Sequence, residues 1–404
     1  MLDNPAPLVP RDTADLVAII RDAVDAETPL ELYGHGTKRG IGHPVVARAG
    51  VDLSAISGVL FYEPDEIVIG LYAGTPLAEV EALLAANNQE LAFEPIDYGP
   101  LFGLPPGSGT IGGALAANLG GPRRIRSGAA RDHVLGVAAV SGRGEVFKSG
   151  GRVVKNVTGY DLSKGLAGSW GTLAAFTELT FKVLPRPEFS ATIALFGLGD
   201  AEGVELLCRA MGSPAEVSGA AHLPAAPAAA LPHLASAGRS CTLIRLEGFR
   251  PSVLYRAEKL NALIGATHET ARLDGAKSRD IWRVIRDAGP FVDHVDPVWR
   301  VSTAPTAGPA FVEALRAGIT FRHYYDWSGG LVWIEIPDAP ADAGASAIRS
   351  ALARFGGHAT LVRAPGIEIS VPRFQPQPPA LAALSRRLKS AFDPLNILNP
   401  GRMG

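Results

Sequence analysis

The 404-residue sequence has few cysteines, no long apolar run and no excess of either charge. Its two cysteines, Cys208 and Cys241, lie far apart and match no metal-ligand spacing, so we expect buried thiols in a reducing compartment. Lys plus Arg (38) and Asp plus Glu (40) nearly balance, which excludes a strongly basic nucleic-acid-binding surface. No stretch of about 18 uninterrupted apolar residues is present, so no membrane span or direct membrane insertion is predicted.

Two further signals are missing. The amino terminus lacks the basic segment and apolar core of a secretory signal peptide, so we expect a cytoplasmic protein that reaches the inner membrane only through partners. The nine histidines are scattered, and none forms an H-x-H or H-x₃-H pair. The sequence therefore predicts no protein-bound catalytic metal.

The length of the chain predicts two or three domains. Hydrophobic periodicity divides it into two regions that mix strand-like and helix-like patterns, followed by a carboxyl-terminal tail. In residues 1–188 we expect a helix capped by Thr13, a helix opened by a Thr75 cap and Pro76, and a hairpin over 134–151. Further strands are predicted at 29–33, 58–62, 67–72 and 173–184, before Pro185 and Pro187 mark a boundary.

Residues 189–365 alternate strand-like and helix-like patterns, which is typical of an α+β domain with an antiparallel sheet. Strands are expected at 191–196, 241–248, 331–336 and 359–363, and helices at 253–264 and 343–355. The Ala/Pro-rich stretch 219–238 reads as a loop. In residues 366–404, a helix places Leu381, Leu384, Leu388 and Phe392 on one face.

Two glycine-rich segments could hold phosphate. Residues 34–40 (GHGTKRG) follow a predicted strand, but their spacing and the absence of a following helix exclude a Rossmann site. A backbone anion nest and a flexible turn both remain open there. Residues 107–121 (GSGTIGGALAANLGG) would let phosphates approach bare backbone, with Thr110 and Asn118 as polar groups. Close packing between two chain segments is the alternative.

These segments belong to an ordered set of motifs. In chain order they are GHGT (34–37), GSGTIGG (107–113), N-x-GG (118–121), RDHVLG (131–136), GYDL (159–162), GSWGTL (168–173) and FDP…ILNPG (392–401). This order resembles the FAD domain of the vanillyl-alcohol-oxidase/PCMH flavoprotein family. More narrowly, GPRR (121–124) and VVKNVTGYDL (153–162) resemble the smaller FAD-domain subunits of bacterial glycolate oxidases.

The resemblance implies an α+β fold: a two-part PCMH-type FAD-binding domain (1–188), an α+β cap domain (189–365) and a carboxyl-terminal segment (366–404) that packs back on the FAD domain. It also implies noncovalent FAD, because Thr37 stands where some relatives carry a histidine bonded to the flavin. The residues implied for FAD are Gly34, His35, Gly36 and Thr37 in the first loop, Gly107, Thr110, Ile111, Gly112, Gly113, Asn118 and Gly121 in the second, and Gly128, Asp132 and Phe176.

For the substrate side, relatives that oxidise 2-hydroxyacids often use a His-rich metal site, yet the corresponding segment 356–363 has only His358. Arg300, in VWRVS, is predicted to bind a substrate carboxylate, or else to be a surface or interdomain arginine whose stem packs on Trp299. Residues 323–327 (HYYDW) form a substrate wall or belong to the core. Lys155 and Tyr160 face either the flavin or a partner.

The resemblance therefore implies an FAD-binding subunit that supports oxidation of glycolate or a related small 2-hydroxyacid. Its partners would be a larger FAD-containing subunit and an iron–sulfur subunit. Two alternatives stay open: a self-sufficient FAD-dependent D-2-hydroxyacid dehydrogenase, and a scaffold subunit that has lost its flavin.

Overall fold

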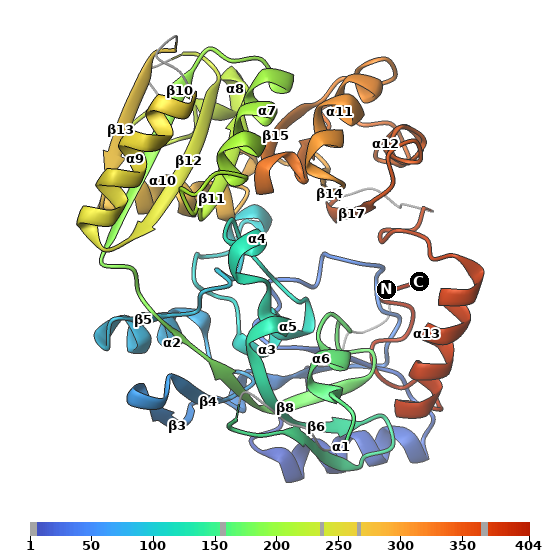
Figure 1. Ribbon diagram of the computed structural model, residues 1–404. Coiled ribbons are helices and arrows are strands. Elements are labelled where there is room, and N and C mark those ends of the chain that lie inside the picture. Colours follow the sequence, from blue (N-terminus) through green and yellow to red (C-terminus); the bar gives the residue numbers. More distant parts are fainter. Residues whose placement is uncertain (1–5, 154–158, 235–237, 265–267, 365–370) are drawn as a thin grey trace.

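The structure is a computed structural model that describes residues 6–153, 159–234, 238–264, 268–364 and 371–404. Figure 1 shows two regions stacked on each other: a first region, from α1 to β9, and a second region, from β10 to β17. Lys155 lies outside the described residues. Within these ranges, no helix combines the length and the apolar character needed to cross a membrane.

The first region is built on a five-stranded antiparallel sheet in the order β3-β4-β8-β6-β7. A parallel pair, β1 with β2, lies beside it, and β5 pairs with β9. The strands are β1 (Leu30–Tyr33), β2 (Ala49–Asp52), β3 (Val59–Glu63), β4 (Val68–Tyr72), β5 (Gln89–Glu90), β6 (Val134–Ser141), β7 (Val146–Gly150), β8 (Ala174–Lys182) and β9 (Leu184–Pro185). The helices are α1 (Thr13–Asp25), α2 (Leu77–Ala86), α3 (Ile111–Ala116), α4 (Arg124–Ser127), α5 (Ala130–His133) and α6 (Leu162–Leu166).

The predicted strands and the hairpin of this region are present, but two predicted caps are wrong. The amino end of α1 is capped by Asp12, whose carboxylate accepts a hydrogen bond from the Asp15 N–H. Thr75 does not cap α2, because its hydroxyl is engaged with the backbone of Gly58 and Tyr72. A threonine hydroxyl can bond to several nearby backbone groups, and the neighbouring strands supplied these partners.

The second region contains an eight-stranded antiparallel sheet in the order β13-β10-β12-β11-β15-β16-β14-β17. Its strands are β10 (Phe189–Phe196), β11 (Gly219–Leu223), β12 (Cys241–Gly248), β13 (Thr270–Asp274), β14 (Val298–Ser302), β15 (Arg322–Asp326), β16 (Leu331–Glu335) and β17 (His358–Arg363). Its helices are α7 (Asp200–Met211), α8 (Ala225–Ala228), α9 (Arg250–Ile264), α10 (Ala276–Arg286), α11 (Gly308–Arg316) and α12 (Ala345–Leu352). The predicted loop over 219–238 is wrong: it begins with β11, which is buried in the middle of this sheet. A short strand of small residues buried on both faces shows no alternation, so its pattern does not identify it.

The two faces of this sheet have different neighbours. Trp299 and Val301 belong to a core shared with helices α11 and α12, whereas Val298 and Trp333 belong to the core that continues into the first region. Because side chains alternate along a strand, Arg300 lies on the face toward the first region. The Arg300 stem therefore does not pack on Trp299, but Arg300 does lie between the two regions, as the alternative of an interdomain arginine expected.

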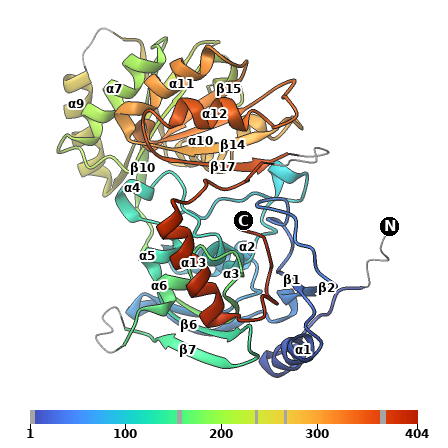
Figure 2. The same cartoon turned by 90° about the vertical axis from the view of Figure 1, so that its right-hand side faces the viewer.

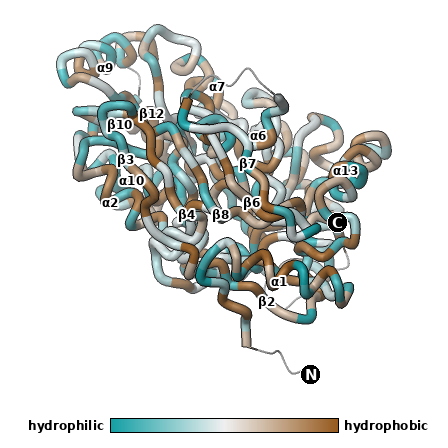
Figure 3. The backbone as a smooth tube through the Cα atoms, turned by 90° about the horizontal axis from the view of Figure 1, so that it is seen from below, coloured by the Kyte–Doolittle hydropathy of each residue, from teal (hydrophilic) through white to brown (hydrophobic). Residues whose placement is uncertain are grey.

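The carboxyl-terminal segment returns to the first region, as predicted, through α13 (Pro379–Phe392) and the tail after it (Figure 2). The Leu30 N–H donates to the Ile397 carbonyl at 2.8 Å. The apolar stripe of α13 points outward, however: Leu381, Leu384 and Leu388 are 47%, 57% and 41% exposed. Lys389 faces inward and donates to the carbonyls of Thr172 and Leu398. Figure 3 shows α13 at the edge of the molecule.

Candidate functional site

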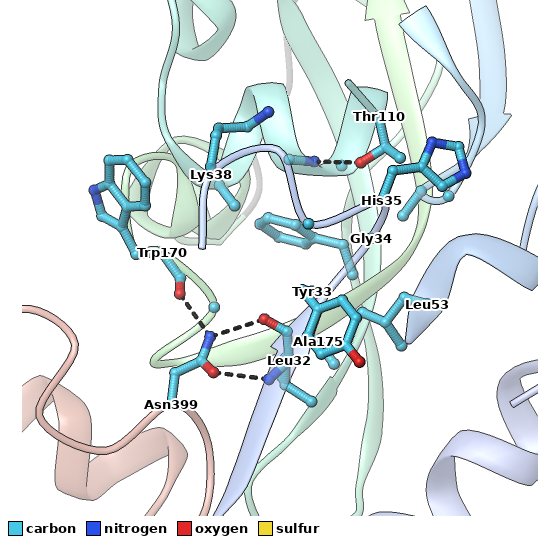
Figure 4. A pocket seen from close by; sticks show the side chains of 18 of the residues that line it. Leu32, Tyr33, Gly34, His35, Lys38, Leu53, Thr110, Trp170, Ala175 and Asn399 are labelled. Carbon is cyan, nitrogen blue, oxygen red and sulfur yellow. Dashed lines mark hydrogen bonds between the residues drawn. The ribbon is translucent and has the colours of Figure 1, made fainter. Parts of the chain in front are cut away.

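A cavity in the first region is enclosed by the two glycine-rich segments, the start of β8 and the tail (Figure 4). The two segments touch: the His35 ring lies 2.9 Å from the Ser108 carbonyl oxygen, and a Cβ added to Gly34 would lie 2.8 Å from Thr110 Oγ1. Of the predicted residues, the cavity is lined by Gly34, His35, Gly36, Thr37, Thr110, Gly112, Gly113 and Phe176.

Other predicted residues do not line this cavity. The fully buried Ile111 belongs to the core, the Asn118 side chain accepts from the Arg131 N–H, and Asp132 accepts from the Ala129 N–H. Gly107 and Gly128 have left-handed backbones, with φ of 79° and 80°, which favour glycine without a ligand. A Cβ on Gly121 would lie 2.5 Å from the Glu94 carbonyl oxygen. Their positions are explained by local structure.

Adjacent glycines at the start of α3 serve different purposes. A Cβ on Gly112 would lie 2.6 Å from the Ala73 carbonyl oxygen, so this glycine permits close packing of two chain segments. A Cβ on Gly113 would lie 3.1 Å from Lys38 Cε and would enter the space between the two loops. Thr110 caps α3, since its hydroxyl accepts from the Gly113 N–H. Close packing therefore explains Gly112, whereas approach of a phosphate to the backbone of Gly113 stays a prediction.

Lys38 is a lining residue that the sequence analysis did not select. Its ammonium donates to Thr37 Oγ1 at 3.1 Å, and no described carboxylate forms an ion pair with it. Burial lowers the pKa of Lys38 to about 8, although the charge of Asp97 opposes this. The available signal was a lysine directly after the GHGT motif, within the glycine-rich segment 34–40.

The tail completes the cavity wall. Asn399 accepts from the Leu32 N–H at 2.7 Å and donates to the Trp170 carbonyl at 2.8 Å (Figure 4). Arg402 donates to the carbonyls of Arg39 and Ile41, and so holds the first glycine-rich loop. Bare loop backbone and one ammonium suit a diphosphate, and the flanking Trp170, Leu32 and Leu53 suit flat rings. The lining therefore fits a dinucleotide such as FAD.

A second cluster lies where the two regions meet. The Arg300 guanidinium carbon lies 4.8 Å from the centre of the Trp327 ring, and that of Arg124 lies 5.2 Å from the same centre. The Trp327 indole N–H donates to the Gly121 carbonyl at 3.0 Å. Trp327 and Ser328 have φ of 52° and 58°, a strained left-handed backbone of the kind that concentrates at functional sites.

The HYYDW segment is divided by strand alternation. His323 and Tyr325 turn toward α7 and bind the Asp200 carboxylate, so they belong to the structure of the second region. Tyr324 lies on the opposite face of the sheet, where its hydroxyl donates to the Ile285 carbonyl of α10 in the second region. Asp326 is 2% exposed, and burial raises its pKa to about 7.

An ion-pair network joins the two regions next to this cluster. Arg123 pairs with Glu90 (2.5 Å) in the first region and with Glu247 (2.8 Å) in the second, while Arg245 pairs with Glu94 (2.8 Å). Although burial opposes ionisation of Glu247, the charges of Arg245 and Arg123 lower its pKa to about 2. The network thus favours the charged form of Glu247, whereas burial raises the pKa of Glu90.

In the part of the chain that the structure describes, no three His, Cys, Asp or Glu side chains are arranged to hold a metal ion. His358 begins β17 and is exposed to solvent.

Residues 5–150 match the family described as FAD binding domain. The sequence is 31% identical to glycolate oxidase subunit GlcE of Escherichia coli (strain K12), over 96% of both chains. It is 26% identical to a D-2-hydroxyglutarate dehydrogenase of Xanthomonas citri pv. viticola, over 99% of this chain and 90% of that one. The fold is similar to that of p-cresol methylhydroxylase, with a TM-score of 0.72 and 16% sequence identity. The match covers 98% of this chain and 88% of that one.

These similarities confirm the PCMH-type α+β fold and FAD as the cofactor. That FAD is held noncovalently stays a prediction, as do the individual residues assigned to it.

Proposed function

Because this chain belongs to the family of FAD-linked oxidoreductase subunits that includes glycolate oxidase subunit GlcE, we propose that it is the FAD-binding subunit of a glycolate oxidase-type complex. It supports oxidation of glycolate or a related 2-hydroxyacid to the 2-oxoacid, with electrons passing through FAD to a partner. The observation that carries this proposal is the similarity to GlcE over 96% of both chains. Residues 1–188, 189–365 and 366–404 are the proposed FAD, cap and carboxyl-terminal segments.

Each part of the site has a proposed task. The backbones of Gly34 to Thr37 and of Gly113, together with the Lys38 ammonium, hold the diphosphate of a noncovalent FAD. When bound, FAD would supply the two-electron acceptor for oxidation at the substrate's hydroxyl carbon. Arg300 holds the substrate carboxylate through its guanidinium fork. These residues position the reactants and supply charge.

The proposed partners are a larger FAD-containing subunit and an iron–sulfur subunit. Support for a partner comes from α13, whose Leu381, Leu384 and Leu388 form an exposed apolar stripe. Contiguous exposed apolar side chains are typical of surfaces that bind a partner. The stripe would bind one of the two subunits, and any contact with the inner membrane would pass through them.

The experiment is to co-express the chain with the two partner subunits and to count flavin and iron in the purified complex. We expect a complex that contains flavin and iron and oxidises glycolate, and a chain that by itself keeps its flavin. A colourless chain that refuses added FAD would overturn the proposal.

A self-sufficient D-2-hydroxyacid dehydrogenase is the second candidate. It is favoured by the similarity to D-2-hydroxyglutarate dehydrogenase over 99% of this chain. Anaerobic mixing of the isolated chain with glycolate or D-lactate separates the two candidates. Bleaching of the flavin absorbance by the chain alone selects the self-sufficient enzyme.

A further inference from the structure

We propose that Arg124 is the second arm of an anion site completed by Arg300, with one arginine from each region, and that this pair holds the carboxylate of a small acid. The identity of the acid as a 2-hydroxyacid rests on the proposed function. The pair itself rests on geometry and charge alone.

The geometry brings the two side chains to one place. Arg124 belongs to the short helix α4 of the first region, and Arg300 belongs to β14 on the sheet face that packs against that region. Both guanidinium groups lie over the ring of Trp327, 5.2 Å and 4.8 Å from its centre. An anion held by both arginines would bridge the two regions.

The charge of the pair is only partly compensated, by the more distant carboxyl groups of Asp132 near Arg124 and Asp326 near Arg300. Within the residues described, neither Arg124 nor Arg300 forms an ion pair, whereas the adjacent Arg123 pairs with Glu90, Glu94 and Glu247. Both side chains are partly buried. Burial lowers the pKa of Arg124, and the positive charge of Arg300 lowers it further. Two like charges that are partly removed from water raise the free energy of the folded chain through repulsion and lost hydration. A bound carboxylate would lower that free energy.

The surroundings are arranged in advance. Trp327 is 7% exposed, and its indole N–H is already bonded to the Gly121 carbonyl, which fixes the ring plane. Trp327 and the following Ser328 keep a left-handed backbone in the turn between β15 and β16. A guanidinium offers two parallel N–H donors, which match the two oxygens of a carboxylate. A small carboxylic acid is therefore the chemical class that this site selects.

The competing explanation is that both arginines merely stack on Trp327 and join the two regions. The two explanations differ in what happens when a free carboxylate is offered. A stacking role predicts no binding of the acid, and a loss of stability in the variants. A binding role predicts saturable binding that each arginine strengthens, with little change in stability.

The test is calorimetric titration of the FAD-loaded chain with oxalate, a dicarboxylate with no C–H bond to oxidise. We expect saturable binding that Arg124→Met and Arg300→Met each weaken roughly tenfold or more. Arg124→Lys should bind with intermediate affinity, because it keeps the charge and loses the fork. Arg126→Met is the matched control, since Arg126 lies on the same helix and is 3.8 Å from Glu216; its affinity should equal that of the wild type.

Absence of oxalate binding to the wild-type chain overturns the inference, and so does unchanged affinity in Arg124→Met. Flavin content and thermal unfolding of every variant show whether it is folded; if Arg124→Met is not, Arg124→Gln replaces it. A chain that binds oxalate through both arginines, within a complex that never oxidises glycolate, would keep this site and refute the proposed function.

Discussion

Arg123 and Arg124 are sequence neighbours in the first region, yet their side chains belong to two clusters of opposite character. The network around Arg123 supplies every charge with a partner from the chain itself and spans both regions. The cluster around Trp327 gathers Arg124 and Arg300 without a described carboxylate partner. Charges satisfied within the chain hold the fold together, whereas charges left unsatisfied are available to a ligand.

The same distinction applies elsewhere. Lys38 lines the FAD cavity without a described ion-pair partner, and the α13 leucines have no apolar neighbours that bury them. Removal of a satisfied group should therefore reduce stability, and removal of an unsatisfied one should reduce binding. The following variants test this difference.

The largest loss of stability is expected for Arg123→Met. It leaves Glu90, Glu94 and Glu247 without the arginine they share, and breaking a buried pair costs about 3–5 kcal/mol. Denaturant unfolding measures this free energy. Arg126→Met, the exposed control, should change it by no more than about 0.5 kcal/mol. If Arg123→Met and Arg126→Met had equal free energies of unfolding, the network would not stabilise the contact between the regions.

Acid should weaken the network more gradually. Because the folded-state pKa of Glu247 is about 2 and its ordinary value is 4.5, its contribution is complete above about 4.5 and is lost as the pH falls toward 2. The free energy of unfolding of Glu247→Gln should therefore decline less over this range than that of the wild type. Parallel curves for the two proteins would show that Glu247 has an ordinary pKa.

Lys38→Met should reduce FAD affinity about tenfold and leave stability nearly unchanged, because it removes an unpaired cation from the cavity. Since the pKa of Lys38 in the free chain is about 8, wild-type affinity should fall as the pH rises through 8. Titration of the flavin-free chain with FAD measures both effects. Lys38→Arg, which stays charged, should bind FAD tightly at every pH. If the FAD affinity of Lys38→Met still fell as the pH rises through 8, the titrating group would be another residue.

The smallest effect on stability is expected for Leu384→Ala, because this side chain is 57% exposed. Leu384→Ala should change the free energy of unfolding by no more than about 0.5 kcal/mol. Leu398→Ala, at a fully buried position, should lower it by about 2–5 kcal/mol. Partner co-purification should instead decrease for Leu384→Ala. A large loss of stability would mean that the stripe contributes to folding.

Much of the fold was predictable because the motifs and strand patterns are local. The hairpin over 134–151, the strands that became β4 and β8, and the returning tail follow from turn residues and periodicity. β11 was missed because burial on both faces erases alternation. The α13 leucines were correctly placed on one face, but periodicity does not say whether that face meets the core or a partner.

The candidate site was predictable to a similar degree. The glycines that line the cavity belong to motifs whose order is visible along the chain. The position of Arg300 next to Trp299 is also visible in the sequence. Lys38, Asn399 and Arg124 were not selected as cofactor or substrate residues. Each depends on a neighbour far away in sequence, and such a neighbour leaves no local pattern.

By itself, the sequence determined the motif order, and with it the FAD-binding fold and the absence of a Rossmann glycine motif. Only the tertiary structure decided which charges find partners: Arg123 meets Glu247 across the regions, while Arg124 meets the ring of Trp327. The physical reason is that the energy of a charge depends on distance and burial, and both are set by contacts between residues more than a hundred positions apart.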